Sequence, residues 1–290
     1  MGLTNQSTGA GVLESELKIE RTCMGDKVIA LAGNPNVGKS TVFNSLTGLN
    51  QHTGNWPGKT VTNAQGKYKH KDKNFIMVDI PGTYSLMANS VEEEVARDFI
   101  CFGYPDATVI VTDATCLERA IRKKISINLD DLSHQLGVPV IGTSARSGEG
   151  LDTLMDAVYN VTIKKADNSP LQITYDDTIE EAISIIEPAI KDLVKDKINS
   201  RWVALKLLDE DETLLKALRK YLDYDLNSNE SILQKVSEAR DELSIAGIDH
   251  NLLRDKIVSH IVGMAEKICK KAITFEREEY NRTDRKIDGI

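Results

Sequence analysis

The stretch Gly33-Asn34-Pro35-Asn36-Val37-Gly38-Lys39-Ser40 decides how this chain folds. It fits the pattern G-x-x-x-x-G-K-[ST]. The apolar run 27–32 before it predicts a buried strand, and 41–46 after it predicts a helix. In such a turn the glycines let backbone N–H groups point inward around a phosphate chain. The sequence therefore predicts a phosphate-binding loop, and a glycine-rich turn that binds nothing is the alternative.

Two side chains in this loop have a defined chemical use. Lys39 can reach the outer phosphates as a point charge. The Ser40 hydroxyl can be a ligand of Mg²⁺ at the positive end of the following helix. We therefore expect a nucleotide phosphate site here.

Length and composition narrow the class of protein. The 290 residues predict about two domains, and the net charge of −8 without a Lys/Arg-rich block argues against nucleic-acid binding. The four cysteines are scattered without metal-ligand spacing, as is typical of a reducing compartment. No run of 18 apolar residues and no basic-then-apolar leader occurs, so we expect neither a membrane span nor secretion.

The segment 47–59 is predicted to be a polar loop, rich in glycine, that could close over a bound nucleotide. Thr60 is the threonine expected to reach Mg²⁺ and the γ-phosphate, and Thr53 and Thr62 are the alternatives. The predicted first switch comprises Gly58, Lys59, Thr60, Val61 and Thr62.

A second switch is predicted where a hairpin ends. Residues 66–68 and 74–78 indicate its two strands, and the second strand runs into Asp79, Ile80, Pro81 and Gly82. In a D-x-x-G turn the aspartate can hold a Mg²⁺-bound water and the glycine amide can contact the γ-phosphate. A turn that merely closes the strand is the alternative.

The next 80 or so residues alternate between helices and strands. Ser90 is expected to cap a helix, 107–112 and 138–143 read as strands, and 129–136 and 151–158 read as helices. This alternation predicts a parallel, doubly wound α/β sheet with its ligand at the carboxyl ends of the strands.

Several longer motifs are more specific than the phosphate loop. They are G-N-W-P-G-K-T-V at 54–61, D-I-P-G-T-Y-S-L at 79–86, E-E-V-A-R-D at 93–98 and D-A-T-C-L-E-R at 113–119. Together they resemble the cytoplasmic G domain of the bacterial ferrous-iron transporter FeoB family, closely over 27–158 and more loosely to the end of the chain. The resemblance implies a Ras-like P-loop GTPase fold followed by a helical spacer.

The resemblance also implies the chemistry. GTP would be hydrolysed to GDP and phosphate, with Mg²⁺ held by Ser40 and Thr60, and by Asp79 through water. Asn36 would help to hold a K⁺ ion, and Ser144, Ala145 and Arg146 would contact the guanine. The implied phosphate-binding set is Gly33, Asn34, Pro35, Asn36, Val37, Gly38, Lys39, Ser40, Thr41 and Gly82. Hydrolysis should be slow, because Thr83 and Tyr84 stand near the place of the catalytic glutamine of Ras-like enzymes.

One expected part is missing. A G domain places a strand ending in N-x-x-D between the strands at 107–112 and 138–143, but 114–137 offers only 24 residues for it and its helices. A βαβ unit takes about 30. We therefore expect this strand to be absent and a helix to run from Arg119 into Ile125. Asn128 and Asp131 have the right spacing, but so do Asn281 and Asp284 in the charged tail, so the pattern is weak.

From 175 onward the apolar period is helical. One stripe covers 179–194 and contains Pro188, which should kink or split it, and further helices are expected at 202–221, 231–246 and 249–273, with Ser231 and Asp249 as caps. This predicts an all-α bundle. By the resemblance it is the spacer that restrains GDP release.

The sequence thus predicts four regions: a flexible arm (1–26), a G domain (27–165), a helical spacer (166–278) and a charged pre-membrane tail (279–290). The function expected is slow GTP hydrolysis that regulates ferrous-iron uptake at the cytoplasmic face of the bacterial inner membrane. Expected partners are the transporter's own permease domain and a small accessory protein, with no nucleic acid. A nucleotide-binding module without guanine selectivity and an unrelated assembly- or RNA-linked P-loop GTPase are the alternatives.

Overall fold

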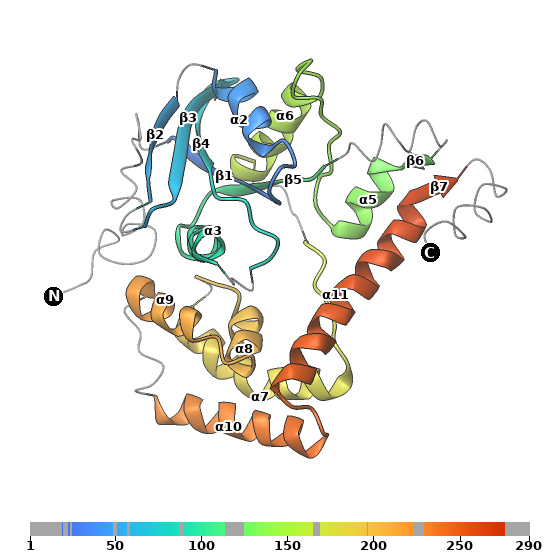
Figure 1. Cartoon of the computed structure of the whole chain (residues 1–290). Coiled ribbons are helices and arrows are strands. Elements are labelled where there is room, and N and C mark those ends of the chain that lie inside the picture. The colour runs from blue at the N-terminus through green and yellow to red at the C-terminus, as the bar shows by residue number, and fades with distance from the viewer. Residues whose placement is uncertain are drawn as a thin grey trace.

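The computed structural model describes residues 19, 23, 25–48, 51–56, 59–86, 90–113, 125–164, 169–195, 197–222 and 229–275. A five-stranded sheet with helices on both faces comes first, and a group of helices packs below it (Figure 1). The expected fold class, a P-loop GTPase sheet followed by a helical region, is confirmed.

The order of strands in the sheet is β2-β3-β4-β1-β5. β1 is parallel to both β4 and β5, whereas β3 is antiparallel to β4 and β2. The sheet is therefore mixed. The expected parallel arrangement holds only for β4, β1 and β5. The strands are β1 Lys27–Gly33, β2 Gln51–Asn55, β3 Thr62–His70, β4 Lys73–Asp79 and β5 Ala107–Val111.

The alternation of side chains along β1 explains why helices cover both faces. Ile29 and Leu31 point to one side and pack with α2 (Lys39–Thr47) and α6 (Leu151–Thr162). Val28 and Ala30 point to the other side and pack with α3 (Val91–Phe102). Because β1 is buried on both faces, it is the apolar centre of a doubly wound fold.

Two expectations about the sheet are wrong. The predicted loop 47–59 contains β2, because this segment finds backbone partners along the edge of β3. The predicted strand 138–143 is not a strand. Backbone groups form a ladder only beside another strand, and among the described strands β5 pairs with β1 alone. The strand expected to stand next to 138–143 is the one that the sequence analysis predicts to be absent.

The expected helix from Arg119 into Ile125 is partly outside the described residues. The next described residues, Ile125–Ile127, form strand β6. This strand pairs with β7, Ile273–Phe275, near the other end of the chain. The backbone N–H of Asn128 extends this contact by donating to the carbonyl of Ala272 at 2.8 Å. A short antiparallel ladder therefore joins two segments almost 150 residues apart. The helix that follows β6 is α5, Leu129–Leu136.

The C-terminal helices form one apolar core, which also takes in Phe102 from α3. Pro188 lies inside α7 and does not split it. The helix expected at 202–221 is two helices, because the Asp211 carboxylate accepts the amides of Thr213 and Leu214 and starts a new helix there. Asn229, not Ser231, caps α10, whereas Asp249 caps α11 as predicted. The helices are α7 Asp177–Val194, α8 Ser200–Leu208, α9 Glu212–Leu222, α10 Glu230–Ile245 and α11 His250–Ala272.

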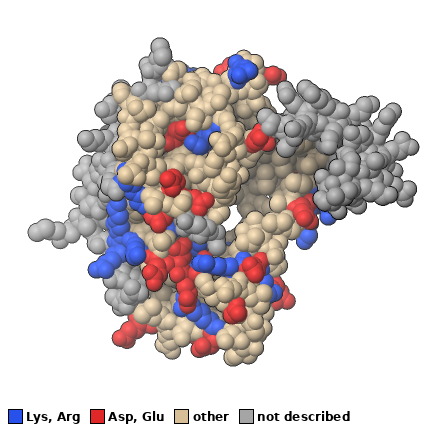
Figure 2. All heavy atoms as spheres, in the orientation of Figure 1, with Lys and Arg blue, Asp and Glu red and all other residues tan. Residues whose placement is uncertain are grey.

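None of the described helices is long and apolar enough to cross a membrane. Acidic and basic side chains are interspersed on the face of the molecule in Figure 2, and its described residues form no broad basic area.

The ion pair between α7 and α8 should be visible in the pH dependence of stability. Arg201 donates two hydrogen bonds to Glu180, at 2.7 and 2.5 Å, and these hold the pKa of Glu180 below its usual range. A lowered pKa means that the pair stabilises the fold above about pH 4.5 and is lost as the pH falls through the folded-state pKa. We expect Glu180→Gln to cost about 1–2 kcal/mol at pH 7.

The cost of Glu180→Gln should shrink towards pH 3.5, as measured by urea unfolding at both pH values. Glu181→Gln is the matched control, because Glu181 is exposed on the same helix. It should change the free energy of unfolding by less than about 0.5 kcal/mol. Equal costs for the two substitutions, or a cost independent of pH, would contradict the assignment.

Candidate functional site

The predicted phosphate-binding loop joins β1 to α2. A Cβ on Gly33 would lie 2.3 Å from the carbonyl oxygen of Val111, so only glycine fits beside β5. Gly38 has a φ of 87° and is the N-cap of α2 without a side-chain bond to the first turn. The amides at the start of α2 therefore need an acceptor, and they stand at the positive end of the helix dipole. The amide of Thr41 already donates to Gly38 at 3.0 Å, which makes it a weaker phosphate donor than expected.

Lys39, Ser40 and Asp79 meet at one point. The Lys39 ammonium forms an ion pair with one carboxylate oxygen of Asp79, and the Ser40 hydroxyl donates to the other at 3.2 Å. The side chains of Lys39 and Asp79 are only 10% and 14% exposed. The structure thus brings together an ammonium group and two side chains with oxygen donors from sequence positions about 40 residues apart.

The sheet explains why these three residues converge. β1 and β4 are parallel neighbours, with Leu31 opposite Asp79 in the ladder, so both strands end at the same edge. Beyond them, Thr83 N–H donates to the carbonyl of Gly33 at 3.1 Å. A Cβ on Gly82 would lie 3.1 Å from Pro35, so the second switch rests against the phosphate loop. The carboxyl edge of a parallel sheet is where such folds bind their ligands.

The donor set suits Mg²⁺. Mg²⁺ prefers oxygen ligands and is usually bound in nucleotide sites by one or two side chains plus phosphate oxygens and water. The Ser40 hydroxyl and the Asp79 carboxylate offer that chemistry, and the contact between Lys39 and Asp79 is one that a phosphate chain would replace. The phosphates of a nucleotide could therefore take the place of the Asp79 carboxylate beside Lys39 at little electrostatic cost.

The structure describes only part of the predicted first switch, 59–62. Gly58 lies outside the described residues. Thr60 is exposed, and no described contact joins it to Ser40 or Asp79. Lys59 instead forms an ion pair with Glu94 on α3 at 2.7 Å, and the carbonyl of Val61 accepts from Trp56 N–H at 2.7 Å. Thr62 begins β3 at the sheet edge.

The predicted base-contacting residues form a turn before α6. Ser144 N–H donates to the carbonyl of Glu149 at 2.9 Å, and the carbonyl of Ala145 accepts from Ser45 of α2 at 2.8 Å. This contact holds the turn against the helix that follows the phosphate loop. Arg146 is exposed beside them.

Asn128 has a structural role that its spacing to Asp131 does not reveal. Its side chain caps α5 by accepting the Asp131 amide at 3.0 Å. A helix cap is a common use of asparagine at this spacing. The N-x-x-D pattern at 128–131 is therefore explained without a base. Asn36, the residue implied for K⁺, is exposed with a left-handed φ of 64°.

A buried charged cluster behind the second switch was not predicted. Arg97 on α3 is 1% exposed, donates to Asp98 at 2.8 Å and to Thr213 at 2.6 Å, and lies 3.8 Å from Asp211. Lys206 on α8, 2% exposed, is within 3.1 Å of Asp211. The sequence carries no signal for this cluster beyond E-E-V-A-R-D, because Lys206, Asp211 and Thr213 lie more than 100 residues away from Arg97.

Comparisons with known protein families bear on this geometry. The family described as ferrous iron transport protein B matches residues 27–122, and the FeoB cytosolic helical domain matches 175–274. The Fe(2+) transporter FeoB of Methanocaldococcus jannaschii is 36% identical over 90% of this chain and 42% of its own length. That of Escherichia coli is 34% identical over 63% of this chain and 27% of its own length. This chain spans less than half of these relatives.

Solved structures extend the likeness to the whole described fold. A GDP-bound mutant of S. thermophilus NFeoB is 31% identical, with a TM-score of 0.69 over 86% of this chain and all of its own. The cytosolic domain of the T. maritima FeoB iron transporter in a GDP form is 27% identical, with a TM-score of 0.66 over 86% of this chain. The alignment to the M. jannaschii protein runs over 298 positions but uses only 90% of 290 residues here. That relative therefore has residues inside the matched region without a counterpart in this chain.

Proposed function

This chain belongs to the FeoB family of ferrous-iron transport proteins, of which it contains the N-terminal G domain and the helical domain, and we propose that it is the part that binds and slowly hydrolyses GTP. Its nucleotide state would be transmitted through the helical spacer to the permease of the same transporter. The single observation that carries this proposal is the meeting of Lys39, Ser40 and Asp79 at the carboxyl edge of the sheet.

The site residues have distinct proposed roles. The start of α2 and Lys39 would bind the β- and γ-phosphates, while Gly82 would present its amide to the γ-phosphate. Mg²⁺ would be held by Ser40 and, once its loop closes, by Thr60, with Asp79 acting through water. When bound, Mg²⁺ neutralises charge that develops on the phosphates. An exposed Asn36 is free to approach a K⁺ ion on the same phosphates.

Slow hydrolysis follows from the side chains after Gly82. Thr83 is buried and its hydroxyl donates to the carbonyl of Ser85 at 2.7 Å, while the ring of Tyr84 is 72% exposed. Neither offers a carboxamide or carboxylate that could orient an attacking water. Turnover would therefore rest on positioning and on cations at the phosphates.

The buried cluster supports coupling between the two parts. Glu94 receives Lys59 of the first switch, and Arg97, one turn further on α3, reaches α9 through Thr213. Phe102 at the end of α3 stacks on Tyr221 with ring centroids 5.2 Å apart. A movement of α3 on nucleotide exchange would thus be felt by the helical spacer.

The remaining assignments are proposals of the same kind. They comprise the division at about residue 165, a place at the cytoplasmic face of the inner membrane, and partnership with a permease and a small accessory protein. Nucleic acid is not among the proposed partners, and the face shown in Figure 2 carries both acidic and basic side chains. The whole transporter's passage of Fe²⁺ would belong to segments other than those described.

A second candidate is a nucleotide-binding module without guanine selectivity. It is favoured by one observation: Asn128 is used as a helix cap, and none of the described residues supplies another N-x-x-D at the edge of β5. Ser144, Ala145 and Arg146 alone would then contact the base.

Competition between nucleotides separates the two candidates. We expect fluorescent GDP to bind the purified chain with Mg²⁺ and to be displaced by unlabelled GDP only about tenfold better than by ADP. A missing pair of hydrogen bonds to the base costs several kcal/mol in sites built to use them, which is why selectivity should be small. The measurement is a displacement titration with GDP, GTP, ADP and ATP, in K⁺ and in Na⁺.

The displacement titration tests both candidates. A preference for guanine above about 1,000-fold would show that another group reads the base and would remove the second candidate. Absence of binding by every nucleotide would contradict the proposed function itself. Faster GTP turnover in K⁺ than in Na⁺ is expected if Asn36 has its proposed role.

A further inference from the structure

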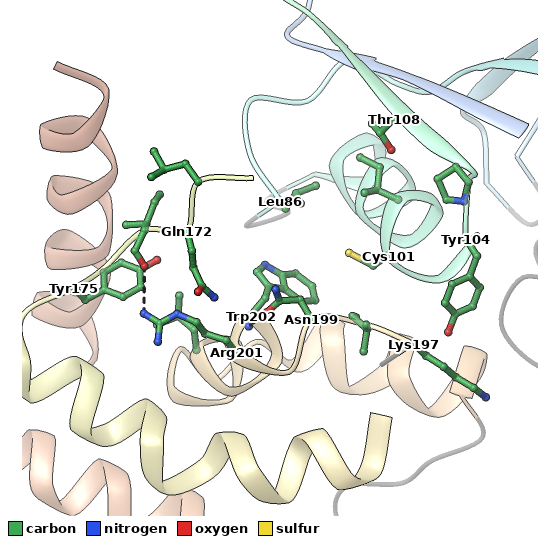
Figure 3. A pocket seen from close by; sticks show the side chains of 16 residues that line it. Leu86, Cys101, Tyr104, Thr108, Gln172, Tyr175, Lys197, Asn199, Arg201 and Trp202 are labelled. Atoms are coloured by element: carbon green, nitrogen blue, oxygen red, sulfur yellow. Dashed lines mark hydrogen bonds between the residues drawn. The ribbon is translucent and has the colours of Figure 1, made fainter. Parts of the chain in front are cut away.

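A cavity of about 570 Å³ lies between α3 and β5 on one side and α8 with the segment 171–175 on the other. Figure 3 shows side chains from both parts of the chain converging on it, among them Cys101 and Thr108 from the sheet side and Trp202 from α8. Small-molecule sites usually have volumes of about 300–1,000 Å³ and often lie between domains. The cavity is separate from the phosphate loop, none of whose residues lines it.

The walls of the cavity are largely apolar. Aromatic rings of Tyr104, Tyr175 and Trp202 stand among aliphatic side chains such as Leu86, Ile198 and Leu205. Burial raises the pKa of the Cys101 thiol to about 12, so this sulfur stays protonated and is neither a nucleophile nor a metal ligand at neutral pH. The chemistry of the walls therefore favours an apolar body held by contact.

The two ends of the cavity differ in charge. Arg201 and Tyr175 lie at one end in Figure 3, but the Arg201 guanidinium is already neutralised by two hydrogen bonds to Glu180. Lys197 and Tyr104 lie at the other end. Lys197 is exposed and makes no ion pair among the described residues, and none of the described lining residues is acidic. An anionic group would therefore be accepted at the Lys197 end.

The Tyr104 hydroxyl strengthens this choice. It is buried and has no hydrogen-bond partner among the described residues, although buried hydroxyls are normally paired. Burial also raises the pKa of Tyr104, so the phenol remains a donor. An anionic oxygen at this end would supply the acceptor that the hydroxyl lacks.

We propose that this cavity is a binding site for an amphiphile with an unbranched or flat apolar body and a single anionic head, of the carboxylate class. The head would lie between Lys197 and Tyr104, and the body would run over Trp202 and under α3. Because the walls come from both parts of the chain, occupancy would favour the arrangement of α3 and α8 seen here.

The fluorescence of Trp202 can report whether the cavity is occupied. The chain has two tryptophans, and Trp56 lies in the other core, where its ring packs edge-on against Phe99 and its Nε1 has no partner among the described residues. Trp56→Phe therefore keeps the ring contact and leaves Trp202 as the sole reporter. The experiment is a titration of this variant with decanoate below its micelle concentration, with decanol and decylammonium as neutral and cationic probes of the same body.

We expect saturable binding of one decanoate per chain, and weaker binding of decanol and of decylammonium. Lys197→Gln should weaken decanoate about tenfold and leave decanol unchanged, whereas Lys191→Gln, an exposed lysine on α7 outside the cavity, should change neither. Thr108→Phe should fill the cavity and abolish binding. Ile110→Phe is its matched control, because Ile110 is 71% exposed on the same strand and does not line the cavity.

Three results would overturn the proposal: no saturable change in Trp202 emission, equal binding to the Thr108→Phe variant, or equal affinity for the three head groups. Binding of fluorescent GDP is measured on the same samples. A chain that binds GDP but not decanoate disproves only the cavity site, and a chain that binds decanoate but not GDP disproves only the proposed nucleotide function.

Discussion

Replacing Lys39 by alanine should lower the affinity for GDP by about 100-fold. Lys39 places a side-chain cation at the start of α2, and a charge-assisted bond to a phosphate in a site shielded from water contributes about 1.5–3 kcal/mol. Removing it also leaves the Asp79 carboxylate without its cation beside the incoming phosphates. The two effects act in the same direction. A titration with fluorescent GDP measures the change.

Lys69→Ala is the control, because Lys69 is exposed on β3 away from the carboxyl edge. It should bind GDP as the parent does. The far-ultraviolet circular dichroism of both variants should match that of the parent. A loss of less than threefold on Lys39→Ala would mean that the nucleotide lies elsewhere, and the proposed function would fall with it.

Replacing Arg97 by methionine should destabilise the chain by about 3–5 kcal/mol. Methionine keeps most of the buried volume but removes the charge that faces Asp98 and Asp211 in the interior. An unpaired buried carboxylate is costly, whereas the intact pair is roughly balanced against its own desolvation. The loss is measured by urea unfolding followed by circular dichroism at 222 nm, a signal to which α-helices contribute most.

The destabilisation should depend on pH in a specific direction. Burial raises the pKa of Asp98, and the neighbouring Arg97 opposes this rise. In Arg97→Met the folded-state pKa of Asp98 rises further, so stability is retained below the unfolded pKa and is lost as the pH increases through the folded one. The cost of Arg97→Met should therefore be larger at pH 7 than at pH 4.

Lys216→Met is the matched control, since Lys216 is exposed on α9. It should alter the free energy of unfolding by less than about 0.5 kcal/mol at either pH. If Arg97→Met were equally harmless, the cluster would not hold α3 to the helical spacer. If the cost of Arg97→Met were the same at pH 4 and pH 7, the loss of stability would not come from the ionised Asp98 carboxylate.

The prediction of individual elements succeeded where local sequence carries the signal. β1, α2 and β4 lie where their apolar pattern and glycine turns place them, and Ser90 and Asp249 cap their helices as expected. β3 contains the predicted 66–68 but is longer, from Thr62 to His70. The predictions failed where a partner outside the segment decides. Part of the segment 47–59 became strand β2 because β3 offers an edge, whereas 138–143 is paired with none of the described strands.

The same division holds for the candidate site. The residue types Lys39, Ser40 and Asp79 could be named from the motifs, since phosphate and Mg²⁺ chemistry needs them at these places. That Asn128 is a helix cap could not be told from its spacing, because a cap and a base contact use the same side-chain oxygen. The Arg97 cluster could not be foreseen either, because burial makes its charges significant and burial is a property of the packed molecule.

The amino-acid sequence by itself determined the glycine-rich turn between β1 and α2, the turn after β4 and the order of a sheet part followed by a helical part, whereas the phosphate-binding and switch roles of these turns stay predictions. These follow from short-range patterns, since glycine torsions, side-chain period and helix caps act over a few residues. Only the tertiary structure decided which strand edges are paired, how α3 is joined to α9, and where a cavity opens between them. Those features depend on contacts between separate elements, which for α3 and α9 are more than 100 positions apart. The energies of these contacts arise only when water is excluded from between the groups that meet.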